Sequence, residues 1–202
     1  MKSKTIKAIL SLSIIGTLAG TIFIGNADAD LFGYKRKSGG NFSAWYDSSV
    51  ASYGYTGAYD TARSNWGGIT SKVSIGKTSS PDGYSTDEFY VGTTSDPKLM
   101  GSNTSYTVAW PVNNPVNRYE KNWDYSVNSL YHNNVYVPSN DAATAFKARY
   151  TTTHEIGHSL GLDHTTGTNA QNSLMKGSFT GSETSHSPTT YDKNQLKSLY
   201  GN

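Results

Sequence analysis

The amino-acid sequence predicts an α+β fold, with strands in the first two thirds of the chain and the long helices in the last third. Three observations support this prediction. Short runs of alternating or β-branched residues, separated by turn residues, fill the middle of the chain. An alanine-rich stretch with a helical pattern covers residues 139–160. A shorter helical pattern follows at residues 189–200, so helices dominate the last third of the chain.

The segment from Met1 to Ala29 has the pattern of a secretory signal peptide. Three lysines precede an apolar run at positions 8–24, and small residues at positions 27–29 match those that a signal peptidase reads. We expect cleavage after Ala29 and export to the extracellular space. An uncleaved anchor is the alternative, although the apolar run falls just short of a comfortable membrane span.

Residues 30–41 are polar and contain three glycines, and they predict a flexible N-terminal segment or a short pro-segment. The expected mature chain runs from Asp30 to Asn202, a length that suits one domain with its own core. The chain contains no cysteine, so it has neither disulfides nor an N-terminal cysteine for a lipid anchor.

The charge of the mature chain is balanced. The whole chain has 17 basic and 15 acidic residues, and the predicted signal peptide holds three lysines and one aspartate, which leaves 14 of each sign. A net charge of zero gives no reason to expect nucleic acid or an anionic membrane as a partner. We expect no stable membrane association after cleavage, and a surface of neutral polar side chains.

The middle of the chain predicts one helix among short strands. Residues 42–47 alternate between apolar and polar and predict a strand. Apolar side chains recur at helical spacing over residues 56–66, and two glycines follow. Further strands are predicted at residues 72–75, 88–91, 106–110, 127–130 and 135–137.

The last third predicts two helices. Ser139 or Asn140 caps a long helix that continues to Leu160. Thr189 has an aspartate three residues later, which is typical of a helix N-terminus. The buried stripe expected for this terminal helix consists of Leu196, Leu199 and Tyr200.

The candidate site lies at the end of the long helix. His154 and His158 are four residues apart, so both imidazoles project from one helix face and can reach one cation. Gly161 stands where a residue without Cβ can end the helix and turn the chain, which can bring His164 to the same cation. Three neutral imidazoles suit Zn²⁺ and leave a fourth position for water, as in catalytic zinc sites. Glu155 lies beside the first ligand and is the expected general base.

The histidines and the acidic loop also have simpler interpretations. The three histidines could be packed or solvated without metal. His132 and His186 are interpreted as loop residues. A calcium ion at the loop around Asp82, with Asp87 and Glu88, is a further possibility, although a solvated turn explains that loop more simply.

The pattern at residues 154–164 is similar to the zinc signature of the metzincin endopeptidases. Met175 stands eleven residues past His164, where this family has a methionine-containing turn. Thr165 is closest to the serine that matrixins have after the third histidine. Residues 191–201 resemble the terminal helix of a matrixin catalytic domain. The chain therefore resembles a bacterial secreted matrixin.

The resemblance implies a zincin-like fold for residues 42–202: a twisted mixed sheet with the active-site helix beneath it, then a small C-terminal subdomain. It implies a monomeric, secreted, zinc-dependent endopeptidase that hydrolyses extracellular proteins or peptides through a zinc-bound water and Glu155. Met175 is implied as an apolar support beneath the metal. Residues 176–179 lack the proline and tyrosine that wall the main specificity pocket of matrixins, so the cleavage preference stays open.

Three further alternatives remain. Residues 106–110 could be the edge strand to which a substrate peptide adds, or an ordinary strand. Without a cysteine, a carboxylate such as Asp30 could hold the enzyme latent, although a solvated terminal residue explains Asp30 more simply. The chain could also be a zinc-dependent binding or adhesion module without turnover, or a metzincin peptidase of another subfamily. Glu155 argues against a binding module, which needs no base.

Overall fold

The computed structural model describes residues 30–109 and 112–202, and the predicted signal peptide lies outside these ranges. Within them, no helix is long and apolar enough to cross a membrane. The elements in chain order are β1 (Gly40–Tyr46), α1 (Ser48–Ser52), α2 (Thr56–Trp66), β2 (Val73–Thr78), β3 (Asp87–Gly92), β4 (Gly101–Thr107), β5 (Asn114–Pro115), β6 (Tyr125–Tyr131), α3 (His132–Val135), α4 (Asp141–Ser159), the 3-10 helix η1 (Gly167–Asn172) and α5 (Thr190–Tyr200).

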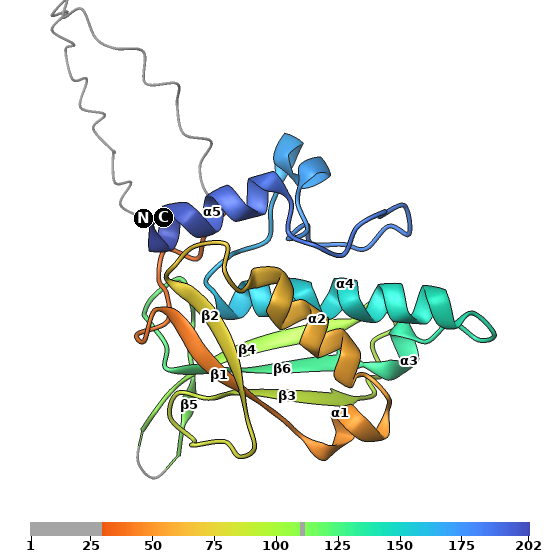
Figure 1. Cartoon of the computed structure of the whole chain (residues 1–202), viewed down its shortest axis with the longest axis horizontal. Helices are drawn as coiled ribbons and strands as arrows, with labels where there is room; N and C mark the ends of the chain where they lie inside the picture. The colour runs from red at the N-terminus through yellow and green to blue at the C-terminus, as the bar shows by residue number, and fades with distance from the viewer. Residues whose placement is uncertain (1–29, 110–111) are drawn as a thin grey trace, which may run out of the picture.

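The six strands form one mixed sheet in the order β2-β1-β3-β6-β4-β5. The first three neighbouring pairs are parallel, whereas β4 runs antiparallel to both β6 and β5. Helices α2 and α4 lie on one face of this sheet, and α5 lies on the side of α4 away from the sheet (Figure 1). The predicted α+β class and mixed sheet are confirmed.

The core lies between the sheet and the two helices. The four apolar residues that α2 places at helical spacing are all buried, and the Tyr59 ring stacks on Phe89 of β3 with 4.7 Å between ring centroids. Trp66 ends α2, and its Nε1 atom donates a 2.7 Å hydrogen bond to the carbonyl oxygen of Thr153 in α4. This bond fixes α2 against the part of α4 that carries the candidate site.

Two strand predictions were wrong. The strand expected at residues 106–110 begins earlier, at Gly101, and ends at Thr107. Its sequence Gly-Ser-Asn-Thr-Ser-Tyr-Thr lacks the alternation of a half-buried strand, because small residues are needed where α4 packs against it. Residues 135–137 form no strand; the short helix α3 and an irregular segment connect β6 to α4 instead.

Three side chains of residues 31–39 contact the body of the domain. Leu31 bridges to Leu162, and Phe32 is only 4% exposed. Arg36 is fully buried and forms an ion pair with the equally buried Asp87 of β3. An uncompensated buried charge is strongly destabilising, so this ion pair holds the segment in place.

The C-terminal part is fastened by α5. Thr189 and Asp192 form the predicted capping box, and Leu196 is buried as expected, whereas Leu199 and Tyr200 are partly exposed. Asp192 is also buried and accepts a 2.9 Å hydrogen bond from the backbone N–H of Leu174. The cap of the terminal helix therefore also positions the chain next to the candidate site.

Candidate metal centre

Helix α4 carries the first two histidines on a rigid support. The Asn140 side chain caps its N-terminus by accepting a 2.9 Å hydrogen bond from the N–H of Ala143, as predicted. The final section of the helix, from Tyr150 to Ser159, is buried throughout between the sheet and the C-terminal part. His154 and His158 thus lie on a section of helix that is held from both sides.

Gly161 turns the chain back as predicted. Its φ of 96° lies in the left-handed region, where a side chain would be strained. The N–H of Gly161 donates to the His158 carbonyl oxygen and the N–H of Leu162 to that of Gly157, at 3.0 and 3.1 Å. These two bonds form a Schellman motif, which ends the helix sharply and returns His164 toward it.

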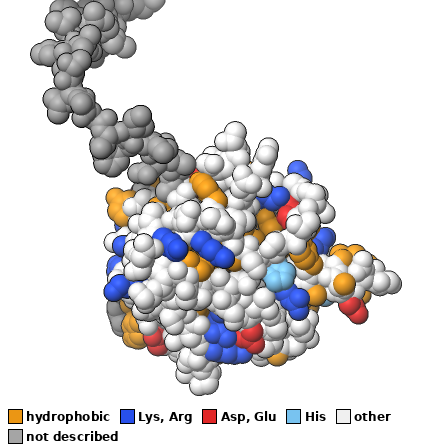
Figure 2. Space-filling model, turned by 45° about the horizontal axis from the view of Figure 1, so that its top comes forward, with side chains coloured by type: hydrophobic (Ala, Val, Ile, Leu, Met, Phe, Trp, Pro, Cys, Tyr) orange, Lys and Arg blue, Asp and Glu red, His pale blue; other side chains and the backbone are white. Residues whose placement is uncertain are grey.

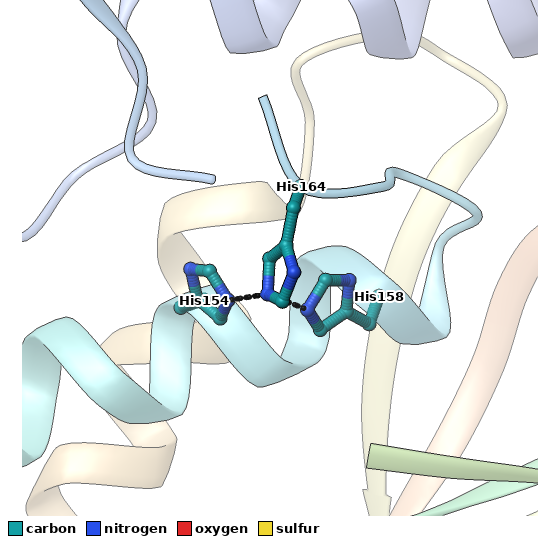
Figure 3. Close-up of side chains that lie close together, drawn as sticks. All are labelled: His154, His158 and His164. Carbon is teal, nitrogen blue, oxygen red and sulfur yellow. Dashed lines mark hydrogen bonds between the residues drawn. The ribbon is translucent and has the colours of Figure 1, made fainter. Parts of the chain in front are cut away.

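The three imidazoles meet at their Nε2 atoms. The Nε2 atom of His164 lies 3.1 Å from that of His154 and 3.2 Å from that of His158, and Figure 3 shows all three rings directed at one point. Two of the rings are oriented through Nδ1, which lies 3.0 Å from the Leu174 carbonyl oxygen in His154 and 2.8 Å from the Leu162 carbonyl oxygen in His158.

This arrangement fits a shared cation better than a hydrogen-bonded cluster. A carbonyl oxygen only accepts, so Nδ1 of His154 and of His158 must donate, and each neutral ring keeps a lone pair on Nε2. His164 can donate one proton to only one of these two lone pairs. The other lone pair then faces the His164 ring without a hydrogen bond. Zn–N bonds of about 2.0–2.1 Å in a tetrahedron put ligand nitrogens about 3.3 Å apart, close to the observed separations. The donor set therefore fits zinc.

Burial keeps the histidines neutral. Desolvation lowers the pKa of His154 to about 4 and that of His158 well below its ordinary value, and it also lowers the pKa of the more exposed His164. Neutral imidazole is the form that binds a metal ion. At neutral pH the three rings are therefore ready to bind without first losing a proton.

Glu155 lies in the same pocket, against the start of β4. A Cβ built on Gly101 would stand 2.7 Å from Glu155 Oε1, so the absence of a side chain there makes room for the carboxylate. Burial raises the pKa of Glu155 to about 8, and the positive charge of Arg118 partly opposes this. A cation bound by the neighbouring histidines would lower this pKa further, which favours a carboxylate that can accept a proton.

Met175 lies against the helix between the two ligands. It is 2% exposed, and a Cβ built on Gly157 would overlap its sulfur. Its carbonyl oxygen accepts a 2.9 Å hydrogen bond from the N–H of Thr165, next to the third histidine. The methionine is thus packed against α4 at Gly157, between His154 and His158.

A pocket of about 310 Å³ opens over the histidines and Glu155. At one end, the ring of Phe179 packs against Tyr150 of α4 with 5.1 Å between centroids. At the other end lie the side chains of Asn103 and Arg118. Residues 176–179 therefore contribute an aromatic ring to the wall of this pocket.

The two remaining histidines lie apart from this cluster. His132 Nδ1 is 2.8 Å from the Tyr55 hydroxyl, in a group of aromatic rings near the N-terminus of α4. His186 is a loop residue whose carbonyl oxygen accepts a hydrogen bond from Asn65. Among the described residues, His154, His158 and His164 are the group that could share a metal ion.

The acidic residues considered for other roles have partners in the protein. Asp82 accepts hydrogen bonds from three backbone N–H groups of its own turn, and Asp87 pairs with Arg36. Asp30 accepts a 3.1 Å hydrogen bond from the Tyr191 hydroxyl. Each of the three carboxylates thus has a partner in the protein, although the second oxygen of Asp87, Oδ2, is buried without one. In the described part of the chain, the acidic residues around Asp82 do not form a cluster that could hold a metal ion.

Sequence reasoning missed the residues that complete the pocket. Gly101 and Arg118 lie in segments without a periodic pattern, and neither belongs to a recognisable motif. Phe179 was noted only as part of a departure from the matrixin pattern. A glycine at the start of a polar strand was the one available signal for close packing against α4.

The fold and the site together define a class of protein, the zinc metallopeptidases whose ligands come from one helix and the turn after it. The chain belongs to the matrixin family, because the matrixin family model matches residues 87–201, more than half of its length. No curated protein matches it in sequence. A chain from the GM1-bound form of the ECX AB5 holotoxin is similar in structure, with a TM-score of 0.50 and 15% identity over 85% of this chain and 86% of that one. At this identity the likeness concerns the fold alone.

Proposed function

We propose that this protein is a secreted endopeptidase that uses zinc and Glu155 to hydrolyse peptide bonds of extracellular proteins. The family supports a zinc metallopeptidase in general. The observation that carries the finer proposal is the convergence of three imidazole lone pairs beside a buried carboxylate in an open pocket.

In this proposal His154, His158 and His164 hold the zinc ion. Zinc in that position supplies a Lewis acid, which lowers the pKa of a water molecule to about 7 and polarises a carbonyl oxygen. The carbonyl oxygens of Leu174 and Leu162 fix two of the rings, so that their Nε2 atoms remain aimed at the ion.

Glu155 is proposed to accept a proton from the attacking water and to pass it to the leaving amine. Burial disfavours the charged carboxylate and therefore raises the pKa of Glu155. The cation and Arg118 favour the charged form. These opposing effects bring the pKa toward neutrality, where a group can both take and return a proton.

The edge of β4 is the proposed platform for the substrate backbone. Strand β5 pairs with β4 only at Tyr106 and Thr107, which leaves the outer edge of residues 101–104 without a neighbouring strand in the described part of the chain. Residues 101–103 line the pocket next to Glu155. A peptide could add here as a further strand, with its backbone hydrogen-bonded to β4 and alternate side chains directed into the pocket.

Two substitutions test this function. Glu155→Gln keeps size and hydrogen bonding but cannot take a proton, so we expect full zinc content with kcat reduced by at least about 10²-fold. His154→Ala removes a ligand and should lose both zinc and activity. Glu120→Gln and His132→Ala are matched controls, because both side chains lie outside the pocket.

The measurement is zinc per chain together with cleavage of an unstructured protein, with and without a chelator. A Glu155→Gln protein that cleaves at the parental rate would place the base elsewhere. A parent protein that binds zinc yet cleaves nothing would favour a binding module.

Export is part of the proposal and rests on the pattern of the segment from Met1 to Ala29. N-terminal sequencing of secreted protein should begin at Asp30, with residues 30–41 retained as a packed part of the domain. Recovery of the intact N-terminus in a membrane fraction would contradict export.

A further inference from the structure

Arg118 reaches the active-site pocket from the irregular segment between β5 and β6. Two contacts hold its side chain. One guanidinium nitrogen, Nη1, donates a 2.7 Å hydrogen bond to Oδ1 of Asn103 in β4. The guanidinium carbon also lies 4.0 Å from the centroid of the Phe32 ring, in a cation–π contact. The charge is thus fixed in the pocket wall rather than mobile on the surface.

Arg118 has no ion-pair partner among the described residues, in contrast to Arg36 and Arg63, which pair with aspartates. The nearby carboxylate of Asp163 is engaged by the Tyr119 hydroxyl at 2.7 Å. The Nε and Nη2 atoms of Arg118 have no hydrogen-bond partner in the described part of the chain. Neither atom is fully buried. These N–H groups are therefore accessible to solvent, and Arg118 is one of the residues that line the pocket.

The position of Arg118 separates it from the aromatic end of the pocket. Phe32 contacts both the Arg118 guanidinium and the His158 ring, which places Arg118 near the C-terminal end of α4. Phe179 packs on Tyr150, eight residues earlier in the helix, which corresponds to about 12 Å along its axis. The two features therefore lie on opposite sides of the metal centre and meet different parts of a bound peptide.

The charged side chains of the pocket are mainly basic. Lys98, Arg118 and Lys176 line it, and the acidic side chain among its lining residues is the proposed catalytic Glu155. Lys176 is neutralised by an ion pair with Glu183. Figure 2 shows basic and acidic side chains scattered over one face of the molecule, among many uncharged groups. In a protein whose mature chain has balanced charge, the basic excess in this pocket favours an anionic ligand.

We infer that Arg118 is a specificity determinant that binds the carboxylate of an Asp or Glu side chain in the substrate peptide, on the His158 side of the scissile bond. This inference rests on the proposed peptidase function. A planar guanidinium with two free N–H directions matches a carboxylate and forms charge-assisted hydrogen bonds with it. The pocket continues past the metal centre on both sides, so a side chain within a longer peptide is the source that its shape favours.

The test begins with a cleavage site mapped in an unstructured protein. Peptides of that site with blocked ends are made with Glu or Gln at each position in turn, so that side-chain carboxylates alone are compared. For the parent protein we expect kcat/KM to favour Glu over Gln by at least about tenfold at one position, as is typical of hydrogen bonds to charged groups.

Substitutions then assign this preference. Arg118→Met should bring the Glu-to-Gln ratio near 1. The ratio is the readout, because Arg118 also lowers the pKa of Glu155 and its loss changes the rate for both peptides. Arg118→Lys keeps the charge and should retain part of the preference. Arg149→Met is the matched control, because Arg149 is exposed and lies outside this pocket, and it should keep the parental ratio. Thermal melts confirm that each variant is folded.

Two results would overturn the inference and leave the peptidase function intact. The first is a parent enzyme with no preference for Glu at any position. The second is an Arg118→Met variant that cleaves both peptides more slowly by the same factor and so keeps the parental Glu-to-Gln ratio. The second result would mean that Arg118 positions Asn103 and Phe32 or acts on the reaction itself. A parent protein that cleaves no peptide would instead contradict the proposed function.

Discussion

Gly157 stands between the two helical histidines, at a point where α4 approaches its neighbours too closely for a methyl group. A Cβ at this position would lie 2.9 Å from both the Trp66 ring and Met175 Cε. Both side chains are buried, and the hydrogen bond from Trp66 Nε1 to the Thr153 carbonyl oxygen keeps the ring from moving away. Gly157→Ala should therefore overpack the helix against its neighbours.

Two opposing effects set the size of the change. Alanine is better than glycine in a helix interior by about 1 kcal/mol. An extra methyl group in a well-packed core costs about 1–3 kcal/mol. Two buried neighbours, one fixed by a hydrogen bond, put this cost at the upper end, so we expect a net loss of about 1–2 kcal/mol in the free energy of unfolding. Each kcal/mol lowers Tm by about 2–4 °C in a domain of this size, which gives a decrease of about 2–8 °C.

Gly57→Ala is the matched control, because Gly57 lies exposed in α2 and nothing stands within 4 Å of its Cβ position. This variant should equal the parent or gain up to about 1 kcal/mol. Thermal melts of the zinc-loaded and chelated proteins, with zinc content measured in parallel, compare the two. A Gly157→Ala protein with the parental Tm and full zinc would refute the packing argument.

Two further changes test the surroundings of the site. Phe32→Ala removes a buried ring beside His158 and should cost about 3–5 kcal/mol in urea unfolding; an unchanged midpoint would show that the N-terminal segment is dispensable. Burial alone would raise the pKa of Glu183, but hydrogen bonds from Lys176 and from backbone N–H groups lower it to about 2. Because this value lies below the ordinary 4.5, the carboxylate contributes its full stability above pH 4.5 and loses it as the pH falls toward 2. Glu183→Gln should therefore flatten the loss of stability between about pH 5 and about pH 2.5 in urea titrations, and equal slopes for the two proteins would contradict this.

The cluster of three histidines could be predicted because its geometry is local. His154 and His158 are one helical turn apart, and Gly161 alone explains the turn that returns His164. Their orientation could not be predicted, because it depends on carbonyl oxygens of Leu174 and Leu162, and no sequence pattern marks a backbone acceptor. The histidine cluster could therefore be predicted from the sequence, but the fixed tautomers that make it suitable for zinc could not.

Strand β4 shows why part of the sheet was mispredicted. Strand prediction relies on β-branched and aromatic side chains, which are favoured because they fit a half-buried pleated surface. Gly101 is buried against α4, where a larger side chain would collide with Thr151 and Glu155, and Ser105 of the same strand is buried too. The small residues that give the active site its room are thus the ones that conceal the strand.

The segment before β1 depends on partners that are distant in the sequence. Phe32 and Arg36 are single side chains among glycines and lysines, and their burial requires Gly161 and Asp87, which lie far along the chain. No local pattern can predict such packing. Because Phe32 lies between the His158 ring and the Arg118 guanidinium, this segment contacts both a proposed metal ligand and the proposed binding group for an acidic side chain. Trimming the chain beyond Phe32 would therefore disturb metal binding and substrate selection together.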